Sequence, residues 1–510
     1  MTEDSIWLSE TNVSQASTAI IYGAISDNLL ADCLHSYDAG VLLVSNKEVA
    51  EKSSSNLFTA NPNLCRESFL STLSDFFLLN QIQPPEIKVS HSVKEEDATL
   101  YEDLVQITLN EIDTLLRARR TRKETGFLRQ LQIFENLNGY LCSRIPEEWK
   151  NLCKNNLAVV VGSGPSLDIS LPLIKHGLPS PVIIAADSSL NALAKENISP
   201  HFIVSIDPEK SFEACGNEKF KPGIAILSSQ SHTSWSKKWE KKCYISGRVI
   251  SEDWLGEKGV GKTSLQAINN AGLTALTFAE FISPSAILLV GMDLSGGGDG
   301  SIRYAENTGR SHIEIDASTF HQIPGNYEET VPTPFFSDWQ ETSQTTASLS
   351  KKRSIINLND RGAFLKGTSL VHPKNFDEVK KLLNENLSSF AEEDLDLLQK
   401  RRGISGLGLN QVLTLLATKC DQIWQLLDKH SNDSKAFEFF KEIFSDKDNA
   451  SMLGDFAFSV MPRLSASDHE ESFEIEREQL KILLWKLEDG ILKSNPSEEF
   501  ILRFLTEKFA

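Results

Sequence analysis

The sequence predicts an α/β protein with a parallel sheet at its centre, a small mixed domain before it and a helical bundle after it. Three observations support this fold class. Between residues 155 and 295, short apolar runs alternate with amphipathic stretches, the order of strands and helices in a parallel sheet covered on both faces. Before residue 104 the apolar runs are short and β-like, with Ser/Asn-rich breaks between them. After residue 374 the apolar residues recur with helical spacing.

The composition limits the classes of protein that fit. A chain of 510 residues is too long for one core, so we expect two or three domains. Its net charge of −19 is unfavourable for a general binder of nucleic acid or anionic membranes, which needs a basic surface. The seven cysteines form no CxxC pair, the apolar runs are shorter than a membrane span, and the N-terminus lacks signal-peptide features. We therefore expect a cytoplasmic protein with no nucleic-acid partner and no membrane insertion.

The pattern divides the chain into four regions. Residues 1–103 predict a small irregular domain of mixed α/β type, and residues 104–154 predict connecting helices. Residues 155–373 predict the central α/β domain, which ends with a strand–turn–strand candidate at 354–367. Residues 374–510 predict a C-terminal helical bundle, with no repeat that would indicate a solenoid. We expect these C-terminal helices to offer a surface for a partner protein or for formation of a homo-oligomer.

Apolar runs in the central region predict five strands, and amphipathic stretches predict three helices between them. The strands are Leu157–Val161, Val182–Ala186, Phe202–Ile206, Ile224–Leu227 and Ala286–Val290, and the helices are Pro165–Lys175, Ser188–Lys195 and Lys262–Phe281. This alternation is typical of a Rossmann-like domain, in which ligands bind beyond the carboxyl ends of the strands. The loops that follow the strands are therefore the expected place of the site.

The loop after the first of these strands predicts a phosphate-binding site. It consists of Gly162, Ser163, Gly164, Pro165, Ser166 and Leu167. Glycines let the backbone approach a ligand without a Cβ clash, and Pro165 suits a first helical turn, where its missing N–H has no helical partner. We expect the N–H groups of Ser166 and Leu167 to be free at the helix N-terminus, where unpaired donors and the helix dipole attract an anion. A plain strand–helix turn that favours Gly and Pro is the alternative.

Carboxylates follow three further strands. Asp187, with Ser188 beside it, follows one strand, Asp207 follows the next, and Asp293 follows the last strand of the run. At the mouth of a parallel sheet such a carboxylate can accept a hydrogen bond from a ribose, bind a metal ion or take up a proton, or it can cap the following helix. Tyr304 comes just after a glycine-rich loop and could face an acceptor or a metal ion. The convergence of several strand ends on one crevice predicts a nucleotide-binding site.

A second glycine-rich segment, GEKGVGKT at residues 256–263, matches the phosphate-loop pattern GxxxxGK[ST], with Asp293 in the place of a Walker B carboxylate. The residues before this segment are polar, whereas a phosphate loop follows an apolar strand, and little chain separates Thr263 from Asp293. We therefore interpret the match as a chance one at the start of a helix. A nucleotide-hydrolysing P-loop is the alternative.

Several motifs occur in order along the central region. They are VVGSGPSL at 160–167, AADSSL at 185–190, IVSIDP at 203–208, LVGMDLS at 289–295 with YA at 304–305, and NLNDRGAFLKG at 357–367. Together they resemble the family that includes the motility accessory factor (Maf) flagellin glycosyltransferases and the archaeal 6-hydroxymethylpterin diphosphokinase MptE. MptE-like proteins are shorter, so the flanking regions favour the Maf branch. One departure is the segment 259–264, where the family usually has a smaller, glycine-rich lead into a helix.

Maf proteins are implicated in transferring nonulosonic acids from CMP-sugars to Ser/Thr hydroxyls of flagellin, and their central domain resembles the CMP-dependent bacterial sialyltransferases. The resemblance implies a sialyltransferase-like central domain in which residues 162–167 hold the phosphate and ribose of CMP. It places Asp187 and Ser188 beside the nucleotide and Tyr304 on the acceptor side. Backbone donors of the loop would stabilise the negative charge that develops on the departing CMP. No cofactor and no metal ion are expected for this reaction.

The transferase also needs a base that removes the proton of the acceptor hydroxyl near the anomeric carbon. Asp207, Asp293 and His232 are the candidates, and the sequence does not rank them. A lone histidine such as His232 is more often a surface or hydrogen-bonded residue than a catalytic one.

Two other functions stay open. In an MptE-like diphosphokinase acting on a hydroxymethylpterin-like substrate, Asp187, Asp207 or Asp293 would hold the Mg²⁺ ion that bridges the phosphates of ATP. A non-catalytic flagellin-binding protein would keep its partner when the loop glycines are replaced. Metal dependence separates the diphosphokinase from the transferase, because the sialyltransferase-like reaction is expected to proceed without a divalent ion.

Overall fold

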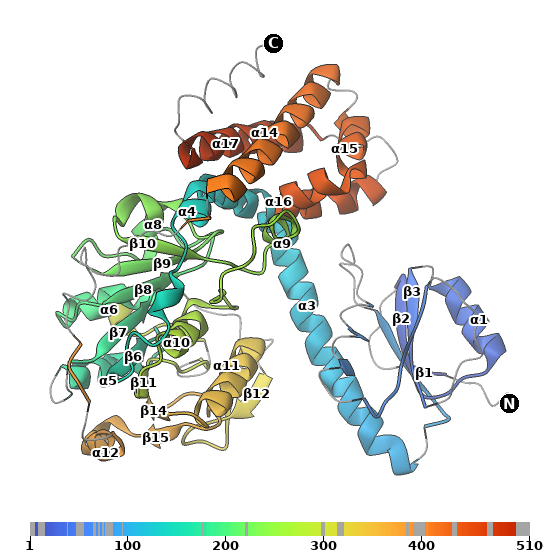
Figure 1. The fold of residues 1–510 in the computed structure, drawn as a ribbon. Coiled ribbons are helices and arrows are strands. Elements are labelled where there is room, and N and C mark those ends of the chain that lie inside the picture. Colours follow the sequence, from blue (N-terminus) through green and yellow to red (C-terminus); the bar gives the residue numbers. More distant parts are fainter. Residues whose placement is uncertain are drawn as a thin grey trace. The chain divides into compact units, whose positions relative to one another are not determined.

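Figure 1 shows the fold as a computed structural model. The structure describes residues 6–8, 16–37, 39–46, 56–64, 68–69, 72–73, 76, 85–93, 95–175, 178, 180–219, 223–296, 301–313, 321–383, 387–390, 403–404, 406–430, 436–466 and 473–495. Contacts between residues divide the chain into two compact units, Met1–Thr125 with Phe458–Ala466, and Gly126–Ala457 with Ser467–Ala510. The domain boundaries expected after residues 103, 154 and 373 stay predictions. Among the described helices, none combines the length and the apolar character needed to cross a membrane.

The first unit is built on a five-stranded sheet with the order β1-β5-β2-β3-β4. Its strands are β1 (Ile6–Leu8), β2 (Thr18–Tyr22), β3 (Gly40–Val44), β4 (Leu57–Ala60) and β5 (Glu86–Ser90), and its helices include α1 (Asp27–Ser36) and the first part of α3 (Glu95–Glu135). Strand β1 is antiparallel to β5, and the other pairs are parallel. Alternate side chains of β2 and β3 enter two separate hydrophobic clusters, so both faces of the sheet are buried.

The second unit contains an eight-stranded sheet with the order β10-β9-β8-β7-β6-β11-β14-β15, in which every pair is parallel. The strands are β6 (Leu157–Val161), β7 (Val182–Ala186), β8 (Phe202–Ser205), β9 (Ile224–Ser228), β10 (Lys242–Ile245), β11 (Ala286–Val290), β14 (Ser354–Leu358) and β15 (Ser369–Val371). The strands that follow β6 in sequence extend the sheet on one side, and β11 begins its other side. The strand order therefore reverses between β6 and β11, and such a reversal opens a crevice at the carboxyl ends of the strands. The predicted parallel sheet and Rossmann-like fold class are confirmed.

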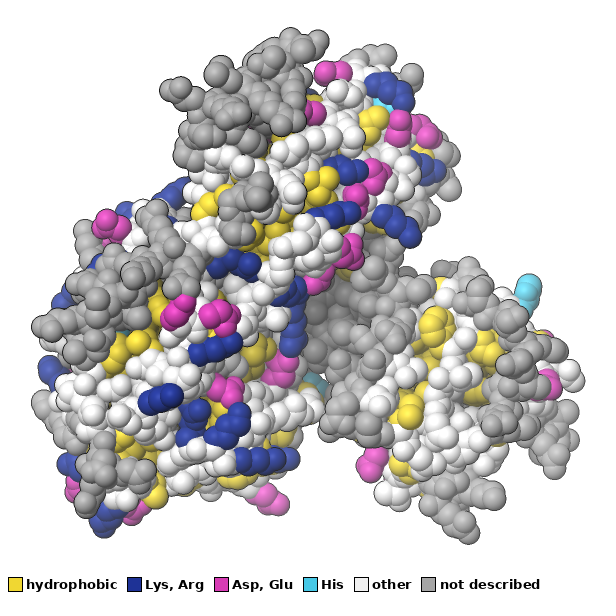
Figure 2. All heavy atoms as spheres, in the orientation of Figure 1, with side chains coloured by type: hydrophobic (Ala, Val, Ile, Leu, Met, Phe, Trp, Pro, Cys, Tyr) yellow, Lys and Arg dark blue, Asp and Glu magenta, His cyan; other side chains and the backbone are white. Residues whose placement is uncertain are grey.

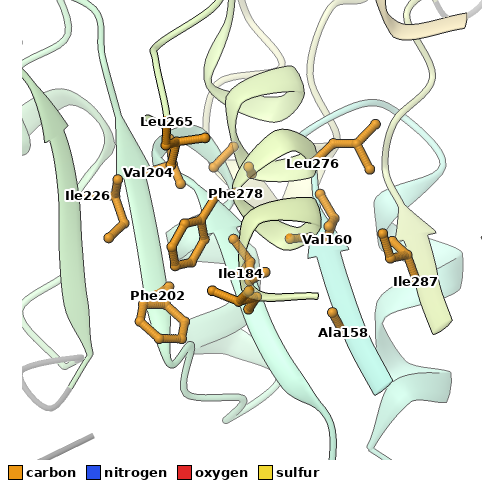
Figure 3. Packing of buried hydrophobic residues seen from close by; sticks show 14 of the residues in the cluster. Ala158, Val160, Ile184, Phe202, Val204, Ile226, Leu265, Leu276, Phe278 and Ile287 are labelled. Carbon is orange, nitrogen blue, oxygen red and sulfur yellow. The ribbon is translucent and has the colours of Figure 1, made fainter. Parts of the chain in front are cut away.

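Helices cover this sheet. They are α5 (Leu167–Ile174), α6 (Leu190–Lys195), α7 (Phe212–Cys215), α8 (Thr233–Lys238), α9 (Ile250–Glu257), α10 (Ala271–Ile282), α11 (Phe336–Leu349) and α12 (Asp377–Leu382), with a hairpin of β12 (His321–Pro324) and β13 (Thr330–Thr333). Helix α10 packs on β6, β7 and β8. Its Phe278 ring lies 4.8 Å from that of Phe202, centroid to centroid, within the cluster drawn in Figure 3. Because α10 is apolar nearly all round, the sheet and the neighbouring helices bury it.

The described C-terminal region is helical, as predicted. It contains α14 (Gly406–Lys429), α15 (Ala436–Ser445), α16 (Lys447–Ala466) and α17 (Glu474–Ser494). Helix α17 packs on α14 and on the short helix α4 (Leu137–Cys142), which in turn contacts β10. Residues 391–402 and 496–510 of the predicted helical bundle lie outside the described residues, as do residues 297–300 of the glycine-rich loop before Tyr304.

Three local predictions are wrong. The long helix expected at Lys262–Phe281 begins only at Ala271, because Asn270 caps it by accepting a hydrogen bond from the N–H of Leu273 at 2.8 Å. The segment 256–263 therefore starts no helix. Instead it begins in the last turn of α9 and continues into the irregular segment that follows α9. After β14 no hairpin forms, and β15 pairs parallel to β14 beyond an irregular stretch.

Acidic and basic side chains are interspersed on the face of the second unit drawn in Figure 2. This mixed distribution accompanies the net charge of −19 of the whole chain. A positive electrostatic potential therefore arises only locally, within individual clefts where a few basic side chains determine it.

Candidate functional site

A cleft opens in the second unit at the carboxyl ends of β6, β7 and β11, where the strand order reverses. Its lining residues are Gly162, Ser163, Gly164, Ala186, Asp187, Ser188, Lys210, Asn270, Ala271, Gly272, Gly291, Met292, Asp293, Leu294, Ser295, Arg303, Tyr304, Phe335 and Asp338. The space in the cleft, with the solvent at its mouth, is about 640 Å³. The crevice expected from the strand ends is therefore present.

Gly162 and Gly164 let the loop after β6 approach the end of β11 and the residues that follow it. Gly162 N–H donates to the carbonyl of Val290, and Gly164 N–H donates to that of Gly291, both at 2.8 Å. A Cβ atom on Gly162 would lie 2.3 Å from the Gly291 carbonyl oxygen, and one on Gly164 would lie 2.1 Å from the carboxylate of Asp293. Both glycines line the cleft, but the close approach that requires them is to the protein's own β11.

The N-terminus of α5 is occupied by Asp293. The carboxylate oxygen Oδ2 accepts hydrogen bonds from the Ser166 N–H at 3.1 Å and the Ser166 hydroxyl at 2.8 Å. The N–H of Leu167 donates to the carbonyl of Gly164. The expectation that these two N–H groups are free for a ligand is therefore wrong. Pro165 precedes α5, which begins at Leu167, and Ser166 and Leu167 are fully buried.

Burial raises the pKa of Asp293 to about 7, although the hydrogen bonds from Ser166 lower it. The side chain is almost fully buried, and its second oxygen, Oδ1, has no hydrogen-bond partner among the described residues. Gly362 adopts a φ of +88°, and a Cβ atom there would lie 2.9 Å from the Cα atom of Asp293. Asp293 thus sits tightly enclosed between the α5 N-terminus and the segment after β14.

On the β7 side of the cleft, Asp187 holds Lys210. The Asp187 carboxylate accepts hydrogen bonds from the Ser188 N–H at 2.7 Å, the Ser188 hydroxyl at 3.0 Å and the Ser205 hydroxyl at 2.9 Å. The Lys210 ammonium lies 3.9 Å from Asp187 and 3.8 Å from Asp207. Burial alone would lower the pKa of Lys210, but the two carboxylates help to raise it above its ordinary value. Lys210 is therefore a charged group that already has acidic partners.

The segment around Tyr304 is fastened across the glycine loop. Ala305 N–H donates to the carbonyl of Ser163 at 3.0 Å, and the N–H groups of Glu306 and Asn307 donate to the carboxylate of Asp168 in the first turn of α5. These contacts place the buried Tyr304 ring at the wall of the cleft, where the sequence predicted a functional residue. They also place Arg303, whose guanidinium carbon lies 5.0 Å from the centre of the Tyr304 ring and 5.1 Å from that of Phe335.

The helix N-terminus that faces the cleft is that of α10. Ala271 and Gly272, its first two residues, line the cleft, and the N–H groups of both have no hydrogen-bond partner among the described residues. Asp338, in the first turn of α11, lines the same wall beside Asn270. Burial raises the pKa of Asp338 above its ordinary value, against the opposing effect of Asn270 and Arg303. This wall combines unpaired donors with a carboxyl group whose ionisation is disfavoured.

Two of the three bases proposed from the sequence lie elsewhere. Asp207 is partly exposed, caps the N–H of Glu209 and is absent from the lining of the cleft. His232 caps α8, where its Nδ1 atom accepts a hydrogen bond from the Ser234 N–H, and it does not line the cleft either. Lys262 of the phosphate-loop-like segment pairs with Asp253 at 2.5 Å. Of the three candidate bases, the structure brings only Asp293 to the cleft.

The sequence did not predict five polar residues of the cleft, which are Lys210, Asn270, Ser295, Arg303 and Asp338. A signal existed for Lys210, which comes three residues after the strand-end Asp207, and for Arg303, which precedes Tyr304. No local pattern marks Asp338, because only the packing of α11 brings it to the strand ends.

Comparisons with known proteins agree with this architecture. Residues 131–298 match the family model described as 6-hydroxymethylpterin diphosphokinase MptE-like. These residues include β6, β11 and the loops between them. The chain is therefore an α/β protein that carries an MptE-like domain. It is Maf-like in fold: the structure of the Maf glycosyltransferase from Magnetospirillum magneticum AMB-1 matches it with a TM-score of 0.52 and 14% sequence identity, over 98% of this chain and 82% of that one. No curated protein sequence matches the chain.

Two serines of the loop should differ in what they contribute to stability, because Ser166 is buried and Ser163 is half-buried. Ser166→Ala should lower stability by about 1–3 kcal/mol, because it removes one of the two donors to the buried Asp293 carboxylate. Ser163→Ala should change stability by less than about 0.5 kcal/mol, because its hydroxyl makes no hydrogen bond among the described residues. Thermal unfolding of both variants measures the difference. Equal melting temperatures would contradict the role given to Ser166.

The stability of the protein should depend on pH through the ionisation of Asp293. The pKa of Asp293 is raised from 3.8 to about 7, so the folded state binds a proton that the unfolded state releases between these values. The stability that comes from binding this proton is fully present below pH 3.8 and is lost as the pH rises from 3.8 through about 7. Asp293→Asn cannot ionise, so its melting temperature relative to wild type should rise between pH 5 and pH 8. A difference that is independent of pH would contradict this assignment. The wild-type slope will not vanish in the variant, because burial also raises the pKa of Glu252 to about 7.

Proposed function

We propose that this chain is a glycosyltransferase that moves a nonulosonic, sialic-acid-like sugar from a CMP-sugar to Ser/Thr hydroxyls of flagellin. The observation that carries the proposal is a cleft at the β6–β11 reversal, lined by Lys210, Arg303 and the N-terminus of α10, in a chain with a Maf-like fold. The motifs at this cleft are also those by which the sequence resembles the Maf family. The nature of the sugar and the acceptor comes from that resemblance.

The electrostatics of the cleft suit a departing nucleotide phosphate. When CMP leaves, its phosphate gains negative charge, and fixed donors that point at this charge lower the barrier. The unpaired N–H groups of Ala271 and Gly272 and the positive end of the α10 dipole can provide such stabilisation. The donors at α5, to which the sequence assigned this task, are already bound to Asp293.

Asp338 is the base that the geometry favours for the acceptor hydroxyl. It lines the cleft, it is partly accessible, and burial shifts its pKa upward, towards the range where a carboxylate removes protons effectively at neutral pH. Asp293 has a raised pKa as well, but Ser166 engages one of its carboxylate oxygens and the other is buried. An acceptor can therefore reach Asp338 without dismantling the loop.

A diphosphokinase is the second candidate, because the family model that matches residues 131–298 carries that name. This reaction needs carboxylates that hold Mg²⁺ against the phosphates of ATP. In the part of the chain that the structure describes, no group of three or more His, Cys, Asp or Glu side chains is placed to hold a metal ion. In the cleft, Asp187 and Asp293 have protein donors on their carboxylates. The arrangement therefore favours the transferase.

Ligand-dependent melting separates the two candidates. The protein is heated with CMP, UDP, ADP or ATP, each with Mg²⁺ and with EDTA. A ligand at 100 times its Kd stabilises by about 2.7 kcal/mol, which raises the melting temperature measurably. We expect stabilisation by CMP in EDTA. Stabilisation only by ATP or ADP with Mg²⁺ would replace the transferase by the diphosphokinase.

The control for this panel is placed at Ser163, which lines the cleft and whose hydroxyl makes no hydrogen bond within the described residues. Ser163→Tyr should fill the mouth of the cleft and abolish the CMP shift, whereas Ser163→Ala should keep most of it. A Gly164 variant is unsuitable, because a Cβ atom there collides with Asp293 and unfolding would mimic a loss of binding. A CMP shift that survives Ser163→Tyr would contradict the placement of the nucleotide.

The role of Asp338 is tested by transfer of sugar from CMP-sialic acid to a flagellin acceptor. Asp338→Asn should lower kcat by about 10²–10⁴, the usual contribution of a general base, while the melting shift by CMP is kept. Glu280→Gln is the control, because Glu280 lies near the end of α10 that is remote from the cleft, pairs with Lys352 and does not line the cleft. Unchanged kcat in Asp338→Asn would contradict the assignment of the base.

A further inference from the structure

Arg303 is a cation of the cleft that is not hydrogen-bonded within the described residues, and its charge interacts with that of Asp338 on the same wall. Among the described residues its guanidinium makes no hydrogen bond and no ion pair, although it lines a cleft that also contains Asp338. A guanidinium carries five N–H donors in a planar fork, and in proteins it normally satisfies them on carboxylates, carbonyls or water. The unused fork is therefore available to a ligand.

The fork is nevertheless held in place. The rings of Tyr304 and Phe335 lie 5.0 and 5.1 Å from the guanidinium carbon, and Tyr304 itself is buried and fastened by the contacts of Ala305 and Glu306. Aromatic contacts of this kind restrain a guanidinium while leaving its N–H edge unoccupied. Less conformational freedom is then lost when a ligand binds.

A second arginine near the same ring has a structural role. Arg310 also lies over the Tyr304 ring, with its guanidinium carbon 5.0 Å from the ring centre. Its Nη1 atom donates to the carbonyl of Ala214 at 3.0 Å and to the Cys215 sulfur at 2.9 Å, and it does not line the cleft. The two arginines share one ring, but only Arg303 lines the cleft, and its guanidinium makes no hydrogen bond within the described residues.

The other lining cation is already compensated. Lys210 lies between Asp187 and Asp207, at 3.9 and 3.8 Å, so its charge is shared with two carboxylates. The N-terminus of α5 is likewise occupied by Asp293. Donors of the cleft without a hydrogen-bond partner among the described residues therefore lie on the wall of Arg303 and the α10 N-terminus, which also carries Asp338.

We propose that Arg303 determines the substrate class by pairing with an oxyanion of the donor, namely the carboxylate of an acidic sugar. The inference rests on the proposed function, since it names the residue that would read the sugar of the nucleotide donor. The planar fork pairs in two parallel hydrogen bonds with a carboxylate or a phosphate oxygen pair. A neutral sugar leaves the fork unpaired, so a donor without the carboxylate gains nothing from it.

The test compares the affinities of CMP and CMP-sialic acid by isothermal titration calorimetry in EDTA. Both ligands carry the same nucleotide and phosphate, and only the second carries a sugar carboxylate. Arg303→Met removes the charge and keeps much of the apolar stem, and Arg310→Met is the matched control on the same ring. Arg303 is partly exposed, so its replacement should leave the melting temperature near that of wild type.

We expect Arg303→Met to weaken CMP-sialic acid at least tenfold, which is about 1.4 kcal/mol, and to change the affinity for CMP by less than threefold. Arg303→Lys should fall between wild type and Arg303→Met, because it keeps the charge without the fork. Arg310→Met should leave both affinities unchanged.

Two results would overturn the inference. An equal loss for both ligands would mean that Arg303 pairs with the nucleotide phosphate, and an unchanged affinity for CMP-sialic acid would mean that it binds no part of the donor. Failure of the proposed function has a different signature, because the wild-type protein would then bind neither CMP nor CMP-sialic acid.

Discussion

The Asp293 carboxylate joins the three segments from which the floor of the cleft is made. Its Oδ2 atom accepts both donors of Ser166 at the N-terminus of α5, while its backbone carbonyl accepts the N–H of Ala363 at 2.8 Å. Two glycines, Gly164 and Gly362, leave the space that this side chain needs. The helix N-terminus and the hydrogen bonds favour the ionised carboxylate, whereas burial disfavours it more strongly, and the result is a pKa of about 7. A buried acid of this kind is costly at high pH, which fits a position where geometry matters more than stability.

With the N-terminus of α5 occupied, unpaired donors of the cleft lie on the opposite wall. Asp293 accepts the hydrogen bonds that a Rossmann-like loop often offers to phosphate, whereas the first N–H groups of α10 and the Arg303 guanidinium make no hydrogen bond within the described residues. The chain as a whole carries a net charge of −19, so these few groups create a local potential that the average composition conceals. The two walls are held in register by the segment around Tyr304, which is tied to Ser163 and Asp168. The cleft is thus an electrostatically uneven space, in which Lys210 lies between two carboxylates and Arg303 has only Asp338 as an acidic neighbour among the lining residues of its wall.

The sequence predicted the elements of the sheet far better than the residues of the site. Five predicted strands of the second unit occur within one residue of their expected ends, because continuous apolar runs have few alternatives to burial in a parallel sheet. The strand-end residues Asp187, Asp293 and Tyr304 do line the cleft. Asp207 and His232 do not, although each follows or caps an element at the same end of the domain. Their local patterns resembled those of site residues because helix caps and binding loops use the same side chains.

By itself, the sequence determined the fold class, the order of strands and helices and the family resemblance, because these depend on hydrophobic periodicity and on motifs that are local in the chain. Only the tertiary structure decided which polar groups remain unpaired. The serine, the aspartate and the glycine that meet at the α5 N-terminus are residues 166, 293 and 362, and no short window of the sequence shows that they lie together. Likewise Arg303 and Arg310 are seven residues apart and contact the same ring, yet one has backbone and sulfur partners and the other has none among the described residues. The pairing of a polar group depends on what the fold brings within about 3 Å of it, and that distance is set by packing between segments remote in sequence.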